Sequence, residues 1–132
     1  MKLLKTLLAG SAALLLSVPA LADVNVGVVL SLTGPGSGLG IPMNNYFTKV
    51  WPQTIAGEKV NLIILDDASD PGKGVANTRR LVTEDKVDVI IGSAATPVAI
   101  PMADVAAESG TVQLAASPAG LPPGKEDRKS VV

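Results

Sequence analysis

The 132-residue chain contains no cysteine and no histidine, and only 2% of its residues are aromatic. These absences exclude a disulfide framework, a thiolate nucleophile, a Ser-His-Asp triad and a zinc finger. The chain also lacks a large excess of charge of either sign, because its formal net charge is −1. This near balance gives no strongly basic surface for binding nucleic acid. The length allows one domain at most, and its core must be built from aliphatic side chains.

The first 22 residues have the pattern of a secretory signal peptide. Lys2 and Lys5 form a basic start, residues 7–16 are apolar but too few to span a bilayer, and residues 20–22 are the small-x-small triplet of a cleavage site. A buried N-terminal helix is the less favoured alternative. We predict cleavage after Ala22 and a periplasmic location, where a chain without cysteine relies on its core.

Apolar runs and helical patterns alternate from Asp23 onward. Strands are predicted at residues 24–30, 59–65, 87–91 and 111–116. The first run has no polar alternation, which is typical of a strand buried on both faces of a parallel sheet. The alternation therefore predicts an α/β fold with a doubly wound, mostly parallel sheet, in the flavodoxin-like strand order 2-1-3-4.

Three helices are predicted between these strands. The first has Pro42 in its first turn and ends at Pro52, and its apolar stripe is expected to pack on the sheet. The stripe consists of Met43, Tyr46, Phe47, Val50 and Trp51. The second covers residues 71–84, with Asp70 as its N-cap and an inward stripe of Val75, Thr78, Leu81 and Val82. The third begins at Pro97 or Pro101, ends at residues 109–110 and turns Met102, Val105 and Ala106 inward.

Ligands of open α/β sheets bind at the carboxyl ends of the strands, where the strand order reverses. Here that point lies between the first and third strands, at loops 31–40 and 92–97, with loop 117–120 beside them. These loops carry hydroxyl groups and glycines but no charged residue. Hydroxyls and helix N-terminal N–H groups suit a carboxylate or another small polar group. The same residue types also serve as caps and turn residues, and the residues alone leave both interpretations open.

Two other motifs are less favoured. The glycines of residues 34–40 match a dinucleotide fingerprint only loosely, and no P-loop is present, because no Gly-Lys-Ser/Thr follows them. Asp66 and Asp67 end the second strand and could hold Mg²⁺ or accept a phosphoryl group. Loop capping, with Asp67 or Asp70 accepting backbone N–H groups, is the favoured interpretation, so we predict no metal site and no cofactor.

Residues 121–132 break the alternation, because no helical stripe appears where a helix is due. We interpret them as the tail of a truncated chain, with a non-native ending EDRKSVV. The sheet is then expected to keep an unpaired edge after residues 111–116.

Four strings cover almost all of residues 24–120: VGVVLSLTGPGSGLG, VNLIILDDASDPGKGVANTRRLV, DKVDVIIGSAATPVAIPMADVA and GTVQLAASPAG. Their most specific features are Thr33-Gly34-Pro35 after the first strand, the loop 66–71 after the second, and Ile91-Gly92 before a loop with hydroxyls. In these strings the chain resembles the N-terminal part of type I periplasmic solute-binding proteins of ABC transporters, in the leucine/isoleucine/valine-binding branch.

The resemblance implies that residues 23–120 form a partial N-terminal lobe, with the hinge and the second lobe absent. It implies that the protein is a substrate-binding component and not an enzyme. The implied ligand is an amino acid, an amide or a small carboxylate, and the implied partner is a permease in the inner membrane. Residues placed at the ligand by the resemblance are Thr96, Ser93, Ala94, Ala95, Ser117, Ala119, Ser37 and Leu39. Amino-acid binders often have Ala-Thr or Ser-Thr where this chain reads Ser117-Pro118-Ala119, so the resemblance leaves the ligand class open. A receptor sensor domain and a flavodoxin-like enzyme are the alternatives, the enzyme being disfavoured because the site loops hold no acid-base pair.

Overall fold

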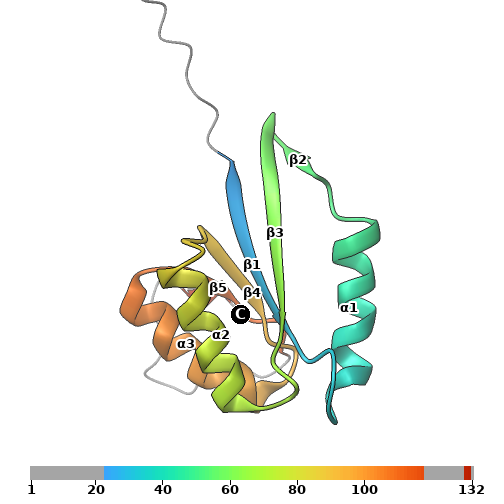
Figure 1. Cartoon of the computed structure of the whole chain (residues 1–132), viewed down its shortest axis with the longest axis vertical. Coiled ribbons are helices and arrows are strands. Elements are labelled where there is room, and N and C mark those ends of the chain that lie inside the picture. Colours follow the sequence, from blue (N-terminus) through green and yellow to red (C-terminus); the bar gives the residue numbers. More distant parts are fainter. Residues whose placement is uncertain (1–22, 118–129, 132) are drawn as a thin grey trace, which may run out of the picture.

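The computed structural model describes residues 23–117 and 130–131. Its sheet lies between α1 on one face and α2 and α3 on the other, with the strand order β2-β3-β1-β4-β5-β6 (Figure 1). In chain order the elements are β1 (Val24–Leu30), α1 (Ser37–Lys49), β2 (Thr54–Ile55), β3 (Glu58–Asp66), α2 (Pro71–Thr83), β4 (Val89–Gly92), α3 (Thr96–Ser109), β5 (Val112–Leu114) and β6 (Ser130–Val131). No helix within residues 23–117 is long and apolar enough to cross a membrane.

The predicted fold class and strand order are confirmed. The four predicted strands are β1, β3, β4 and β5, and they pair in parallel in the order β3-β1-β4-β5. The sequence analysis missed β2, a two-residue strand that pairs antiparallel with the start of β3. Ala56 and Gly57 form the turn between them with φ values of 53° and 89°, the left-handed backbone that tight hairpin turns require.

The apolar side chains of β1 pack into two hydrophobic cores, one on each face of the sheet. Val29 packs toward α2 and α3, against Leu81 and Met102 among others. Val28 and Leu30 point to the opposite face, where Phe47 of α1 joins them. Each face of this central strand is therefore buried, as a strand without polar alternation predicts.

Helix α1 differs most from its prediction. It begins at Ser37, so Pro42 lies inside the helix and not in its first turn. Phe47 is buried and Met43 and Trp51 pack beside it, but Tyr46 and Val50 are 49% and 65% exposed. The expectation that the whole apolar stripe faces the sheet is therefore wrong, because α1 contacts the sheet along a narrow line.

Helices α2 and α3 match their predictions closely. The Asp70 side chain caps α2 by accepting a hydrogen bond from the Lys73 N–H at 2.7 Å. Thr78 and Leu81 are buried, whereas Val75 and Val82 are half-buried. Helix α3 begins at Thr96 with Pro97 in its first turn, and the three residues predicted to face inward are all buried.

One face of the sheet is only partly covered. Helix α1 lies over β1 and β3, and beside it an apolar hollow of about 310 Å³ extends across to β5. Its lining includes Val24, Val26, Val89, Ile91 and Leu114. The lining is apolar throughout these five residues, and it ranges from buried at Val26 to exposed at Leu114.

The far edge of β5 also departs from expectation. Residues Ser130–Val131 form β6 and pair in parallel with Gln113 and Leu114. The expectation of an unpaired edge is wrong at these two positions. This pairing shows only that the edge of β5 is occupied at these two positions. The interpretation of residues 121–132 as a non-native tail stays a prediction.

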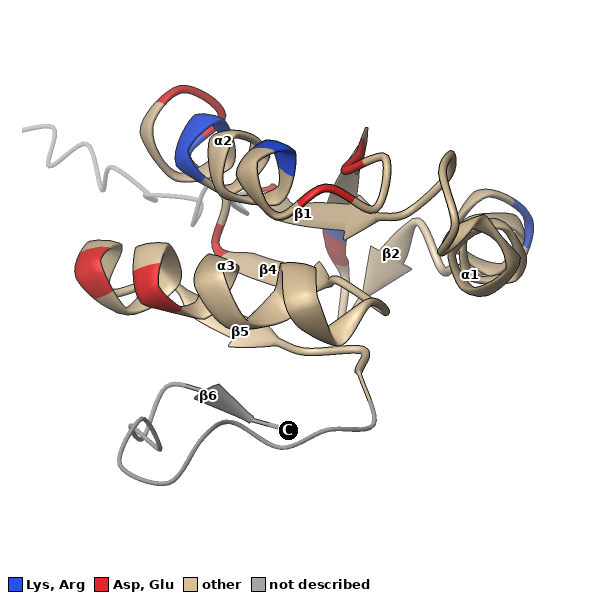
Figure 2. Cartoon of the chain, turned by 90° about the horizontal axis from the view of Figure 1, so that it is seen from below, with Lys and Arg blue, Asp and Glu red and all other residues tan. Residues whose placement is uncertain are grey.

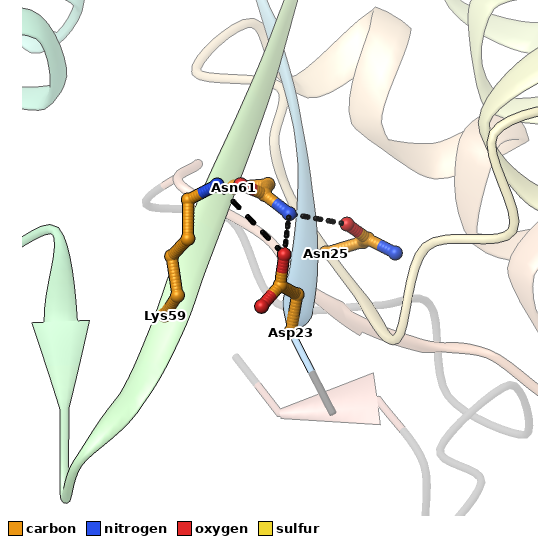
Figure 3. A network of polar contacts seen from close by, with 4 residues as sticks. All are labelled: Asp23, Asn25, Lys59 and Asn61. Carbon is orange, nitrogen blue, oxygen red and sulfur yellow. Dashed lines mark hydrogen bonds and ion pairs between the residues drawn. The ribbon is translucent and has the colours of Figure 1, made fainter. Parts of the chain in front are cut away.

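A polar network anchors the start of β1 at the other end of the strands (Figure 3). The Asn61 side-chain amide donates to Asp23 and to the Asn25 side chain, each at 3.2 Å. Lys59 adds an ion pair with Asp23 at 3.8 Å between exposed side chains. The network joins the start of β1 to β3, at the edge opposite the predicted site.

Candidate functional site

Four loops meet at the carboxyl ends of the parallel strands. They follow β1, β3, β4 and β5, and they lead into the N-termini of α1, α2 and α3 where a helix follows. Figure 2 views the molecule from that side, and the first turns of α3 are tan whereas its later turns carry Asp104 and Glu108. The described residues that the sequence predicts at the ligand lie at this one edge, on neighbouring loops and in the first turns of α1 and α3.

The centre of this edge is the buried carboxylate of Asp67, which is 0% exposed. Ser31, which follows β1, donates to one carboxylate oxygen at 2.6 Å. Ser93, which follows β4, donates to the other at 2.7 Å. The N–H of Ser69 supplies a third bond at 2.7 Å. One carboxylate thus ties together the loops after three adjacent strands with neutral donors.

Asp66 ties two of these loops, those after β1 and β3, nearer the surface. Its carboxylate accepts from the Thr33 hydroxyl at 2.6 Å, and from the N–H groups of Leu32 at 2.8 Å and Ala68 at 2.8 Å. Partial burial raises the pKa of this carboxyl group, but the hydroxyl and the backbone N–H donors outweigh it and lower the pKa below its usual value of 3.8. The prediction that Asp67 or Asp70 accepts backbone N–H groups before the next helix agrees with the bonds from Lys73 to Asp70 and from Ser69 to Asp67, whereas the hydroxyl bonds of Asp66 and Asp67 join loops.

Ser69 completes this joint between the loops after β1 and β3. Its hydroxyl accepts from the Gly36 N–H at 2.8 Å and donates to the Thr33 carbonyl at 3.0 Å. Gly34 has a φ of 77°, and a Cβ there would lie 2.5 Å from the Ala68 carbonyl oxygen. The close approach of the two loops therefore requires glycine at this position.

The helix N-termini at this edge are not equivalent. Helix α2 is capped by Asp70, but neither α1 nor α3 has a side-chain cap. In the first turn of α3, Val98 and Ala99 donate to the Ala95 carbonyl, and Ala95 donates to the Ser93 hydroxyl. Because Pro97 has no N–H, only the Thr96 N–H of this turn lacks an acceptor among the described residues. The two uncapped helices flank the point where the strand order reverses.

Thr96 also joins two of the loops. Its hydroxyl is hydrogen bonded to the Ser117 hydroxyl, which brings the loop after β5 against the start of α3. Thr96 is half-buried and Ser117 is buried. A hydroxyl pair and an N–H group at a helix N-terminus can together bind a carboxylate or another polar acceptor.

The other predicted site residues lie on the same edge but differ in exposure. Ser93 and Ala94 are buried, and the Ser93 hydroxyl is already directed to Asp67. Ser37 is half-buried in the first turn of α1, and Leu39 is 57% exposed. Ala119 lies outside the described residues.

Sequence reasoning missed two residues that shape this edge. The buried Gln113 side chain donates to the Gly92 carbonyl at 2.9 Å and to the Ala99 carbonyl at 3.2 Å, which fixes β5 to the region before and within α3. Gly92 has a φ of 119°, and a Cβ there would lie 1.9 Å from the Val29 carbonyl oxygen. A polar residue inside a strand pattern and a glycine at a strand end were the available signals.

No group of three or more acidic residues that could hold a metal ion occurs in the part of the chain that the structure describes. The oxygens of Asp66, Asp67 and Asp70 instead accept hydrogen bonds from hydroxyl and N–H groups.

The fold and this edge define a class of α/β domains that bind ligands where parallel strands end. The chain belongs to the periplasmic binding protein family, whose model matches residues 23–132. It is 36% identical over 117 residues to the Leu/Ile/Val-binding protein BraC3 of Rhizobium johnstonii, which covers 84% of this chain. The chain spans only about a third, 32%, of that relative's length.

Solved structures agree with this assignment. An extracellular ligand-binding receptor from Rhodopseudomonas palustris HaA2 is 45% identical with a TM-score of 0.68, over 71% of this chain and 26% of the receptor. A solute-binding protein of an ABC transporter from Rhodopseudomonas palustris BisB5, in complex with 3,4-dihydroxybenzoic acid, is 29% identical with a TM-score of 0.66. The match covers 72% of this chain and 27% of that protein. The matched proteins are binding proteins, and this supports a solute-binding role for the chain.

Proposed function

We propose that this chain is part of the extracytoplasmic substrate-binding component of an ABC transporter, which binds an amino acid or a similar small polar solute. Residues 23–120 would contribute to its N-terminal lobe, residues 1–22 would be the cleaved signal peptide, and residues 121–132 would be a non-native tail. The protein would act in the periplasm as a binding protein without a cofactor, with a permease of the inner membrane as its partner.

The observation that carries the proposal is the pair of uncapped helix N-termini beside the strand-order reversal. Helix α2, which begins beyond this point, has its own side-chain cap and needs no ligand. At α3 the N–H and the hydroxyl of Thr96 lie together, next to Ser117. An anionic or polar group of a solute would supply the acceptor that the described residues do not provide.

The action of such a protein requires no bond to be made or broken. A solute held between this edge and a second lobe would stabilise the closed arrangement of the two lobes, and the permease would distinguish the closed form from the open one. The second lobe would supply the partner for an ammonium group, because the loops after β1, β4 and β5 of this lobe carry no acidic side chain up to Ser117.

The names of the relatives support two solute classes. The Rhizobium relative is named a Leu/Ile/Val-binding protein, and the BisB5 protein is in complex with a dihydroxybenzoic acid. Both solutes carry a carboxylate, which fits the N-terminus of α3. The sequence Ser117-Pro118-Ala119 lacks the threonine that amino-acid binders often have there. We therefore keep an aromatic acid as a second candidate ligand, in addition to an amino acid.

The test is the role of Thr96 in the full-length protein. Replacing Thr96 with alanine should weaken binding of a carboxylate solute by about 1–3 kcal/mol, the range for losing a hydrogen bond to a charged group. Thr96→Ser keeps the hydroxyl and should retain most of the affinity. The control is Thr78→Ala, because Thr78 is buried on α2 and its hydroxyl donates to the Gly74 carbonyl. Calorimetry that gives equal affinities for wild type and Thr96→Ala would remove Thr96 from the site.

The location has its own test. Material recovered from the periplasm should begin at Asp23 by mass spectrometry, because the signal pattern places cleavage after Ala22. A soluble cytoplasmic protein that keeps Met1 would contradict this prediction.

A receptor sensor domain is the second candidate, since the HaA2 protein is described as an extracellular ligand-binding receptor. The full-length sequence separates the two functions. A membrane-spanning segment followed by a signalling domain would indicate a receptor, whereas a second lobe that ends the protein would indicate a transport component.

A further inference from the structure

We propose that Asp67 is a positioning residue, which sets the orientation of the Thr96 loop without touching the solute. The proposal rests on the proposed function in one respect, namely that Thr96 meets the solute. The Asp67 carboxylate is fully buried, and its three hydrogen bonds come from a serine after β1, a serine after β4 and a backbone N–H of its own loop. No charged donor takes part in these three bonds.

The chain of contacts from Asp67 to the site is short. Ser93 donates to Asp67, and the same hydroxyl accepts from the Ala95 N–H at 3.2 Å. The Ala95 carbonyl in turn accepts the first two helical hydrogen bonds of α3. The direction of the Thr96 N–H is therefore fixed through Ser93 by a carboxylate in the loop after a different strand.

The same carboxylate restrains the other side of the strand-order reversal. Ser31 occupies the start of the loop that leads to α1, and it is as completely buried as Asp67 and Ser93. A Cβ on Gly40 of α1 would lie 2.1 Å from the Ser31 carbonyl oxygen, so the first turn of α1 sits directly against Ser31. Asp67 thus links the two uncapped helix N-termini to each other.

A purely structural carboxylate would be a costly choice for this position. Burying a charge carries a desolvation penalty that apolar packing avoids, and buried polar networks are known to hold one arrangement in preference to others. Ser31 and the Ser69 N–H donate to one carboxylate oxygen of Asp67, and Ser93 donates to the other. This geometry favours a role in fixing the relative position of two loops.

The test uses the full-length protein with L-isoleucine and 3,4-dihydroxybenzoate as probes. Variants Asp67→Asn, Asp67→Ala and Ser31→Ala are compared with Thr78→Ala, another fully buried residue with a hydrogen-bonded side chain. Calorimetry measures probe affinity, and amide hydrogen exchange without ligand measures the protection of the hydrogen-bonded N–H groups of Ala95, Val98 and Ala99.

We expect Asp67→Ala to weaken binding of the probe at least tenfold and to raise exchange at Ala95, Val98 and Ala99 at least tenfold. Asp67→Asn keeps the shape and most hydrogen bonds and should lie between wild type and Asp67→Ala. Ser31→Ala should raise the same exchange, although the Ser31 hydroxyl is bonded to Asp67 and not to these N–H groups, and Thr78→Ala should leave it within twofold.

Other results overturn the proposal in distinct ways. Affinity and exchange within twofold of wild type in both Asp67→Asn and Ser31→Ala would show that the link has no effect, even if Asp67→Ala does not fold. Equal changes in Thr78→Ala would reveal general destabilisation. A wild type that binds neither probe would contradict the proposed solute classes, and the exchange measurements would still decide the role of Asp67.

Discussion

The contact between α2 and α3 gives a sharp prediction about packing. A Cβ on Gly74 would lie 2.4 Å from a Val98 methyl carbon and 3.4 Å from Met102. Ordinary contacts between carbon atoms are about 3.5–4.0 Å, so Gly74→Ala creates an overlap of about 1 Å. Val98 and Met102 are both fully buried.

The magnitude follows from two opposed effects. Overpacking in a dense core costs about 1–3 kcal/mol. Alanine is about 0.8–1.0 kcal/mol more favourable than glycine inside a helix. Gly74→Ala should therefore lower the free energy of unfolding by up to about 2 kcal/mol. Gly38→Ala in α1 is the matched control, because a Cβ at Gly38 would meet nothing within 4 Å, and this variant should be neutral or gain up to about 1 kcal/mol.

The assay is urea denaturation of the mature full-length protein, with the slope of the transition compared between variants. Val98→Ala removes the methyl group that the new Cβ meets. In that background Gly74→Ala should become neutral or stabilising, and this would be the signature of a local clash. A Gly74→Ala protein that gains as much stability as Gly38→Ala would refute the reasoning, because it would mean that the new Cβ meets no resistance between the two helices.

The remaining predictions concern pH and folding. Hydrogen bonds lower the folded pKa of Asp66, so its contribution to stability should be present above the usual pKa of 3.8 and be lost as the pH falls through the lower folded value. Asp66→Asn should be less stable than wild type at pH 7, and urea titrations that show the same difference at pH 7 and well below 3.8 would contradict this. Residues 23–132 expressed alone should melt broadly and bind solute poorly, because the apolar hollow beside α1 is uncovered and a second lobe would be missing. Cooperative melting with micromolar binding of an amino acid would show instead that this part is self-sufficient.

The strands and the sheet order could be predicted because each depends on a local pattern. The apolar run of β1 requires two covered faces, and Asp70-Pro71 marks the start of α2 by its chemistry alone. Helix α1 was harder to predict, because its apolar stripe is wider than the line along which it meets the sheet. Tyr46 and Val50 lie on the outer part of that stripe, where sequence periodicity carries no information about the position of the helix.

The sequence predicted where the loops of the candidate site meet better than it predicted the role of each residue in them. The loops around Thr96 and Ser117 do meet, as parallel strand ends require. A sequence pattern treats the hydroxyl residues alike, although Ser93 is committed to Asp67 and Thr96 has an N–H with no acceptor among the described residues. One signal was available: Ser31, Asp67 and Ser93 each follow a strand at once, on three strands predicted to be adjacent. What could not be predicted is which hydroxyl is buried, because this depends on how tightly the loops close.

The missing cap of α3 also bears on how such a lobe can change over time. Ala95 occupies the N-cap position with the extended backbone that capping side chains use. A serine, asparagine or aspartate there would satisfy the first turn permanently and stabilise the empty protein, typically by about 1 kcal/mol. It would do so by occupying the place that the proposed solute would take. If the proposed site is correct, alanine at this position exchanges thermal stability for an open binding position, and substitutions selected for heat tolerance alone should weaken the proposed binding here first.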